Sequence, residues 1–152
     1  MKNKMDETAN AYDSPTNYLI LVDKQEHLVG IYEGGRGKWT RLHRWLCSVG
    51  APESETPSGN FLLGSYDGLP FHRQYIKLYE PDGTLAHCRW ATRITTGGYL
   101  FHSIVYTKKH SLVYVYDGRL GEDISLGCIR LEIENAKWIY DNIPESTRCV
   151  IY

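Results

Sequence analysis

The feature that most limits what this chain can fold into is that its apolar segments are short and end repeatedly at glycine, proline or polar turn residues. Glycine occurs 14 times and tyrosine 12 times in 152 residues. Aromatic and β-branched residues favour strands, and glycine allows the reversals between them. A chain of this length forms one domain with a hydrophobic core and is too short for two. We therefore expect one mainly β domain.

The expected strands follow from the apolar runs and the turns between them. Residues 18–23 and 28–33 flank a polar segment, which predicts a hairpin. Residues 39–49 predict a third strand, and Pro57 introduces a fourth over residues 59–64. Further strands are predicted at 89–95, 99–103 and 148–152.

One helix is predicted near the end of the chain, where four apolar residues recur at helical spacing: Ala136, Ile139, Tyr140 and Ile143. Acidic residues at 132 and 134 suit its positive N-terminal end, and Pro144 ends it. Residues 66–87 show no sustained period, so we expect a long loop there, of the kind that often forms a lid, with one short strand at 75–79.

Charge and hydropathy exclude several partners. Lysine and arginine number 17 against 18 acidic residues, so no basic block is available for nucleic acid or an anionic membrane surface. No apolar run is long enough to cross a bilayer, and the N-terminal segment lacks the apolar centre of a signal peptide. We interpret residues 1–17 as a leader or linker remnant, solvated over 2–14, and residues 18–152 as the domain. Any export or anchoring signal is expected outside this sequence.

The four cysteines form no C-x-x-C pair, so neither a zinc ribbon nor a thioredoxin motif is indicated. His87 and Cys88 together with His72 could suggest a metal site, but their spacing matches no common ligand pattern, so we expect no metal and no cofactor. Cys47 and Cys149 lie in apolar strand patterns and are expected in the core.

Cys128 is different, because it lies in the block Ser-Leu-Gly-Cys-Ile-Arg-Leu at residues 125–131, directly before the predicted helix. Glycine lets backbone N–H groups face an oxyanion, and a nearby cation favours the thiolate.

A thiol needs a base, and His102, at the end of an apolar strand, is the best candidate. The pairing of this histidine with a Ser-x-Gly-Cys-x-Arg block resembles the YkuD-type L,D-transpeptidase family. The resemblance covers roughly residues 18–152 and includes three further segments: Thr-Pro-Ser-Gly-Asn-Phe at 56–61, Asp-Gly-Arg-Leu-Gly at 117–121 and the helix at 136–142. Together these motifs are specific, whereas each alone would be weak.

The resemblance implies a sandwich of two mixed sheets, with one helix after the cysteine loop and an active site under a loop lid. It also implies that Cys128 attacks the carbonyl between the third residue of a stem tetrapeptide and its terminal D-Ala. His102 would take the thiol proton, and the carbonyl of Ser103 would orient the imidazole. The N–H groups of Gly127 and Cys128 would form the oxyanion hole, and Arg130 would either position the loop or bind a substrate carboxylate.

Several other residues are predicted to contact substrate. Trp90, Tyr99 and Tyr106 could line a peptide or glycan groove, although strand aromatics more often pack in the core. Ser125 is interpreted as tying down the cysteine loop. Leu126 stands where many family members have a second histidine beside the nucleophile.

The expected activity is therefore formation of 3→3 cross-links, in which an amine of a second stem resolves the thioester on Cys128. Donor and acceptor stems of peptidoglycan are the expected partners, carbapenems are expected to acylate the cysteine, and the domain is expected to act as a monomer at the cell wall. Two alternatives remain open: a carboxypeptidase or endopeptidase that hydrolyses stems, and a non-catalytic wall-binding module.

Overall fold

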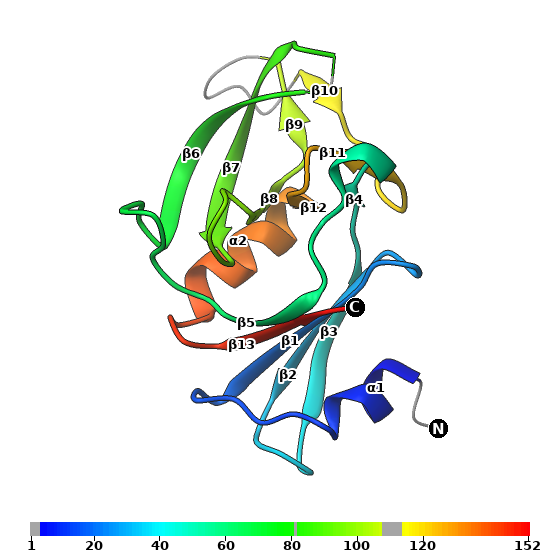
Figure 1. The fold of residues 1–152 in the computed structure, drawn as a ribbon, viewed down its shortest axis with the longest axis vertical. Coiled ribbons are helices and arrows are strands. Elements are labelled where there is room, and N and C mark those ends of the chain that lie inside the picture. Colours follow the sequence, from blue (N-terminus) through cyan, green and yellow to red (C-terminus); the bar gives the residue numbers. More distant parts are fainter. Residues whose placement is uncertain (1–3, 81, 108–113) are drawn as a thin grey trace.

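The computed structural model describes residues 4–80, 82–107 and 114–152, which are mostly β structure with a helix after the last strand of the second sheet (Figure 1). The first sheet has five strands in the order β3-β2-β1-β13-β5. In that order they are Thr40–Leu46, Leu28–Glu33, Tyr18–Asp23, Arg148–Ile151 and Gly59–Leu62. The β1–β13 pair is parallel and the other pairs are antiparallel, so the sheet is mixed. The predicted hairpin of β1 and β2 is confirmed.

The second sheet curls over the first and carries the cysteine (Figure 1). Its order is β10-β9-β7-β8-β12, with β6 paired to β7. In that order the strands are Val115–Asp117, Val105–Tyr106, Leu85–Arg93, Leu100–Ser103 and Ile129–Leu131, and β6 is His72–Tyr79. The β8–β12 pair is parallel, so this sheet is also mixed. A small parallel pair, β4 (Val49–Gly50) with β11 (Asp123–Ser125), completes the β structure and confirms the predicted fold class.

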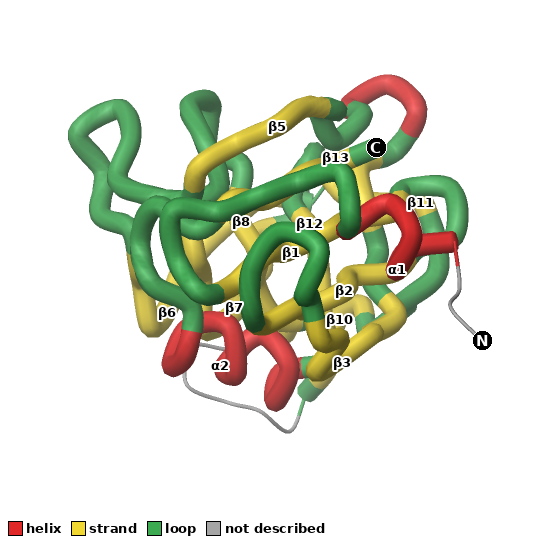
Figure 2. The backbone as a smooth tube through the Cα atoms, turned by 90° about the horizontal axis from the view of Figure 1, so that it is seen from below, coloured by secondary structure: helices red, strands yellow, loops and turns green. Residues whose placement is uncertain are grey.

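Helix α2 (Ile133–Asn142) confirms the single helix predicted after the cysteine. Its buried residues Ala136 and Ile139 share one core cluster with Ile20 of β1 and Phe101 of β8, so the helix joins both sheets through a common core. Figure 2 shows α2 on one side of the sheets, well separated from the N-terminal helix. The core thereby fixes β8 and β12, the two strands that frame the cysteine loop.

The region predicted as a loop lid is instead a β-hairpin. Strand β6 pairs with β7 from His72 opposite Thr92 to Tyr79 opposite Leu85, so both strands are longer than predicted. The prediction was wrong because the exposed and buried residues of β6 do not alternate regularly. The third predicted strand also ends early, at Leu46, because the backbone of Ser48 turns to bond that of Arg130 beside the cysteine loop.

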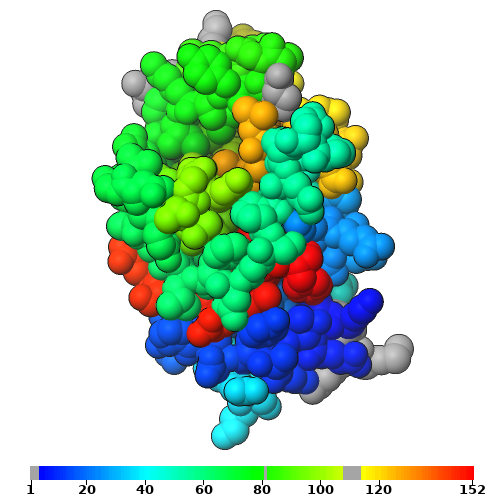
Figure 3. All heavy atoms as spheres, viewed as in Figure 1, coloured from blue at the N-terminus to red at the C-terminus, as the bar shows by residue number. Residues whose placement is uncertain are grey.

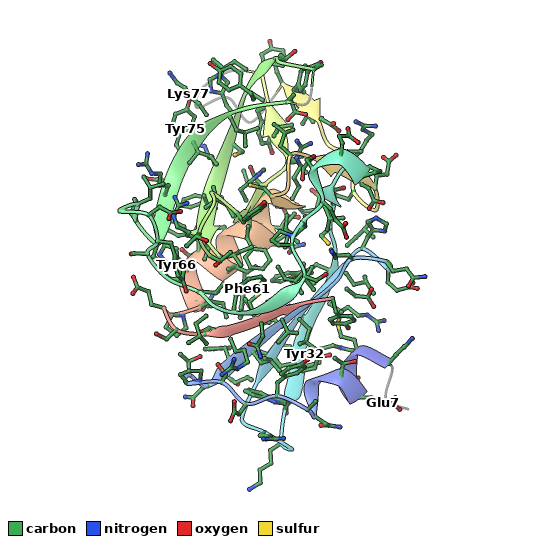
Figure 4. All side chains as sticks on the ribbon, in the orientation of Figure 1. Glu7, Tyr32, Phe61, Tyr66, Tyr75 and Lys77 are labelled. Atoms are coloured by element: carbon green, nitrogen blue, oxygen red, sulfur yellow. The ribbon has the colours of Figure 1, made fainter. Side chains whose placement is uncertain are left out.

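The N-terminal segment predicted to be solvated contains a packed helix, α1 (Lys4–Ala9); residues 2 and 3 of that segment lie outside the described residues. Met5 and Ala9 are buried against the first sheet, and the Tyr32 hydroxyl donates a 2.7 Å hydrogen bond to Asp6. Figure 4 shows Tyr32 between that sheet and α1. The division of the chain at residue 17 stays a prediction. Within the described part of the chain, no helix is long and apolar enough to cross a membrane.

Candidate active site

Strand register places Cys128 and His102 on neighbouring strands. Ile129 of β12 is paired with Phe101 of β8, and Arg130 is paired with His102. Cys128, one residue before Ile129, is therefore level with the residue before Phe101. Side chains two apart on a strand share one face, so Cys128 and His102 lie on the same face of the second sheet. In Figure 3 the orange cysteine segment reaches the surface between the yellow-green loop before β8 and the teal segment before β5.

The imidazole of His102 is buried and oriented by its neighbour. Its Nδ1 lies 2.6 Å from the carbonyl oxygen of Ser103, and because that oxygen can only accept, Nδ1 carries the proton. Nε2 is then the unprotonated nitrogen. Burial, with a smaller contribution from Arg130, lowers the pKa of His102 to about 4, against an opposing effect of the Ser103 carbonyl. The ring is therefore neutral at neutral pH and can accept a proton.

The thiol of Cys128 is partly exposed, and its Sγ lies 3.5 Å from the carbonyl oxygen of Gly98. Burial raises the pKa of the Cys128 thiol, although the N–H of Leu100 and the charges of Arg130 and Arg93 act in the opposite direction. The thiol and the imidazole are thus both neutral at rest. Attack by this cysteine requires proton transfer to a base, which fits a neighbouring neutral histidine.

The cysteine loop has a conformation that only glycine adopts easily. Gly127 has φ +127°, and a Cβ at this position would meet Cε1 of the Tyr99 ring at 2.6 Å. The Ser125 hydroxyl accepts the Gly127 N–H at 3.1 Å and donates to the Cys128 carbonyl at 2.7 Å. Gly127 therefore has no free N–H for an oxyanion, which differs from the expected two-donor arrangement. The Ser125 hydroxyl thus bonds two consecutive residues of the cysteine loop.

Thr56 determines which way the peptide between Gly127 and Cys128 faces. This residue is fully buried, and its hydroxyl donates to the Gly127 carbonyl at 2.7 Å and accepts the Gly50 N–H at 2.9 Å. Because C=O and N–H point in opposite directions in a trans peptide, the Cys128 N–H points away from Thr56. That N–H has no hydrogen-bond partner among the described residues. It is therefore available to a ligand.

Arg130 is buried beneath the site. Its guanidinium lies 2.7 Å from a carboxylate oxygen of Glu80 and 3.5 Å from one of Asp117. Burial raises the pKa of Glu80 even though Arg130 opposes this effect. Of the two roles predicted for Arg130, this environment favours positioning of the cysteine loop over contact with a substrate carboxylate.

A groove of about 560 Å³ opens beside the cysteine. It is lined by apolar residues and three cations from the hairpin and its neighbours: Leu69, Arg73, Tyr75, Ile76, Lys77, Leu78, Arg93, Gly98, Leu100 and Cys128. Figure 4 places Tyr75 and Lys77 on β6, along this wall. The lining residues of β6 were not assigned from the sequence, because a short strand was predicted at 75–79 but its pairing with β7 was not.

None of the three aromatic residues predicted to contact substrate is among those that line this groove. Trp90 packs edge-on against Tyr140 of α2 at 5.0 Å, with Lys137 over its ring. Tyr99 covers Gly127 and thereby supports the loop. Tyr106 is buried in the second sheet. Leu126 is 53% exposed, two positions before Cys128, and is free to contact a ligand.

The remaining cysteine, histidine and acidic side chains are candidates either for the core or for a metal site. Cys47 and Cys149 are fully buried core residues, as predicted, and burial raises the pKa of the Cys47 thiol to about 12. Among residues 4–80, 82–107 and 114–152, no group of three or more His, Cys, Asp or Glu side chains could hold a metal ion.

Comparisons with known proteins find relatives of this chain in sequence and in fold. YciB of Bacillus subtilis (strain 168), which carries a provisional L,D-transpeptidase name, is 45% identical over 135 residues. The alignment covers 87% of this chain and 64% of YciB, so the chain spans slightly less than two thirds of that relative.

Solved structures share the fold. A fused Zn-dependent amidase/peptidase/peptidoglycan-binding domain-containing protein of Clostridium acetobutylicum matches with a TM-score of 0.70 and 33% identity, over 96% of this chain and 57% of that one. L,D-transpeptidase 3 of Mycobacterium tuberculosis, solved with a faropenem-derived adduct, matches with a TM-score of 0.65 and 22% identity, over 89% of this chain and 60% of that one. Residues 17–151 match the sequence profile of the L,D-transpeptidase catalytic domain. The chain belongs to the YkuD family of L,D-transpeptidase catalytic domains.

Proposed function

We propose that this domain is a peptidoglycan L,D-transpeptidase that forms 3→3 cross-links through a thioester on Cys128. The observation that carries the proposal is the arrangement of three groups: a neutral thiol, a neutral imidazole on the same sheet face and an unpaired Cys128 N–H. These are the nucleophile, base and oxyanion donor that acyl transfer needs. Stem peptides of the cell wall are the proposed partners, and the domain is proposed to act there as a monomer.

The first half-reaction releases D-Ala. The sulfur of Cys128 attacks the carbonyl carbon between the third stem residue and D-Ala, while Nε2 of His102 takes the thiol proton. The negative charge that develops on the carbonyl oxygen is stabilised by the Cys128 N–H. Collapse of the intermediate breaks the C–N bond, and His102 returns the proton to the departing nitrogen of D-Ala. The Ser103 carbonyl stabilises the imidazolium in between.

The second half-reaction resolves the thioester. An amine of the acceptor stem attacks the thioester carbonyl, His102 accepts the amine proton, and the sulfur leaves as the thiol after that proton is returned. A new amide bond then joins two stems. Water in place of the amine would give a trimmed tripeptide, so the partly exposed position of Cys128 keeps the carboxypeptidase as the second candidate.

The test is incubation of the protein with disaccharide-tetrapeptide fragments, followed by mass spectrometry, with Cys128→Ala in parallel. We expect D-Ala release and stem dimers with the unmodified protein and neither with the variant. Tripeptide without dimers would replace the transpeptidase with the carboxypeptidase. Binding of stems without turnover in both proteins would favour the wall-binding module.

The hydroxyl of Thr56 gives a separate prediction about the oxyanion donor. Thr56→Val keeps the side-chain shape but removes the bond to the Gly127 carbonyl, so the Cys128 N–H loses its fixed direction. We expect acylation of Cys128 by a carbapenem, followed by intact mass, to slow by about tenfold, less than the loss of a whole oxyanion donor. Thr56→Ser should acylate at nearly the original rate.

Ser54→Ala is the matched control for this experiment. The Ser54 hydroxyl also bonds the cysteine loop, but through the Ser125 carbonyl at 2.8 Å and not through the Gly127–Cys128 peptide. Ser54→Ala should therefore change the acylation rate by less than about twofold, because a single hydrogen bond of this kind contributes only a modest net free energy. Equal slowing by Thr56→Val and Ser54→Ala would show that general loosening of the loop, and not the direction of one N–H, limits the reaction.

A further inference from the structure

The groove beside Cys128 is strongly cationic. Arg73 and Lys77 on β6 and Arg93 on β7 all line it, and no lining residue is acidic. Arg93 of β7 is paired with Leu100 of β8, and Leu100 is level with Cys128 across the next strand. Arg93 therefore lies in the same row of the sheet as Cys128. This concentration of charge is local, because the whole sequence has a net charge of −1.

None of these three cationic residues forms an ion pair with another residue in the described part of the chain. Arg73 and Lys77 are exposed and have no ion-pair partner among the described residues. Arg93 is buried and uses Nε to bond the Pro70 carbonyl at 3.0 Å, which holds its guanidinium at the wall. Asp67, which does not line the groove and accepts the Gly97 N–H at 2.8 Å, offsets part of the charge of Arg93. The groove therefore carries an excess of positive charge, mainly from Arg73 and Lys77.

A groove of this charge suits an extended ligand with several carboxylates and disfavours one with free amines. We propose that Arg73, Lys77 and Arg93 make the groove a donor subsite that selects stem tetrapeptides with free carboxylates over stems in which the same groups are amidated. This inference rests on the proposed function for the identity of the ligand.

The experiment measures binding and turnover of two matched ligands. One is a disaccharide-tetrapeptide with free side-chain carboxylates, and the other is the same compound with these groups converted to carboxamides. Calorimetry on the Cys128→Ala variant gives Kd without turnover. We expect the free-carboxylate stem to bind about tenfold more tightly at low salt, with the difference shrinking as ionic strength rises. In the unmodified protein the same preference should appear in KM for D-Ala release, with similar kcat.

Variants assign the effect to the groove. Arg73→Gln combined with Lys77→Gln should bring the two Kd values within about twofold. The matched control is Arg36→Gln with Lys38→Gln, which removes one arginine and one lysine from the exposed loop between β2 and β3, in the other sheet (Figure 1). The control should keep the full preference.

The outcomes separate this inference from the proposed function. Equal Kd values for the two stems in the unmodified groove, or an equal loss of preference in the Arg36/Lys38 control, would overturn the donor subsite even if D-Ala is released. Charge-dependent binding without any D-Ala release would support the subsite and overturn the transpeptidase activity.

Discussion

Glu80→Gln is expected to lower the free energy of unfolding by about 3 kcal/mol, because it leaves the charge of Arg130 buried with a weaker partner. Arg130 is 1% exposed and Glu80 is 5% exposed, and their 2.7 Å contact is shorter than the 3.5 Å contact to Asp117. Glutamine keeps the shape and one acceptor oxygen but removes the charge. Urea denaturation of both proteins measures the difference.

Two further variants make this prediction specific. Glu80→Gln combined with Arg130→Met removes both charges and should recover most of the lost stability, since a buried pair replaced by apolar groups is often near neutral. Glu53 is an exposed residue that, like Glu80, borders a pocket of about 250 Å³. Glu53→Gln should change the free energy of unfolding by less than about 0.5 kcal/mol. A Glu80→Gln protein as stable as the original would mean that Asp117 alone compensates Arg130.

This buried pair also explains why part of the site could not be predicted from the sequence. Glu80 and Arg130 are 50 positions apart and meet only because the β6–β7 hairpin folds over the cysteine loop. Short strands were predicted at 75–79 and 89–95, but the rest of the segment was predicted as a loop and no pairing was predicted, so the acidic and basic side chains of the hairpin had no assigned positions. Arg73 and Lys77 were missed for the same reason.

Local signals predicted other parts correctly. The β1–β2 hairpin depends on adjacent apolar runs around a polar turn, and α2 depends on helical spacing ended by Pro144, so both could be read without tertiary information. Helix α1 has only six residues and no such pattern; burial of Met5 and the bond from Tyr32 to Asp6 hold it in place.

The proposed nucleophile and base were chosen from motif residues, whereas their supporting contacts required the fold. Sequence reasoning assigned two oxyanion donors, but the Ser125 hydroxyl engages the N–H of Gly127. In the sequence, Thr56 is only the first residue of the Thr-Pro-Ser-Gly-Asn-Phe segment that resembles the family, and no role was predicted for its side chain. Its bond to the Gly127 carbonyl spans 71 positions, and no local pattern predicts such a contact.

Acid should destabilise the protein specifically through His102. Its folded-state pKa of about 4 lies below the value of about 6.5 for an unfolded histidine. Above pH 6.5 neither state binds the proton, so stability is unaffected there. As pH falls from 6.5 toward 4, the unfolded chain binds a proton that the folded protein excludes, and the free energy of unfolding should fall by about 3 kcal/mol.

Comparison with His102→Gln isolates this contribution. Other titrating groups, including His72, whose pKa burial also lowers, are present in both proteins and largely cancel in the difference. We expect urea denaturation at several pH values to show the two stability curves converging, by about 3 kcal/mol, between pH 6.5 and pH 4. Parallel curves would mean that His102 takes up a proton as readily in the folded protein as in the unfolded chain. The imidazole would then be protonated in the resting site at mildly acidic pH, and the neutral base on which the proposed proton transfer depends would be lost below about pH 6.5.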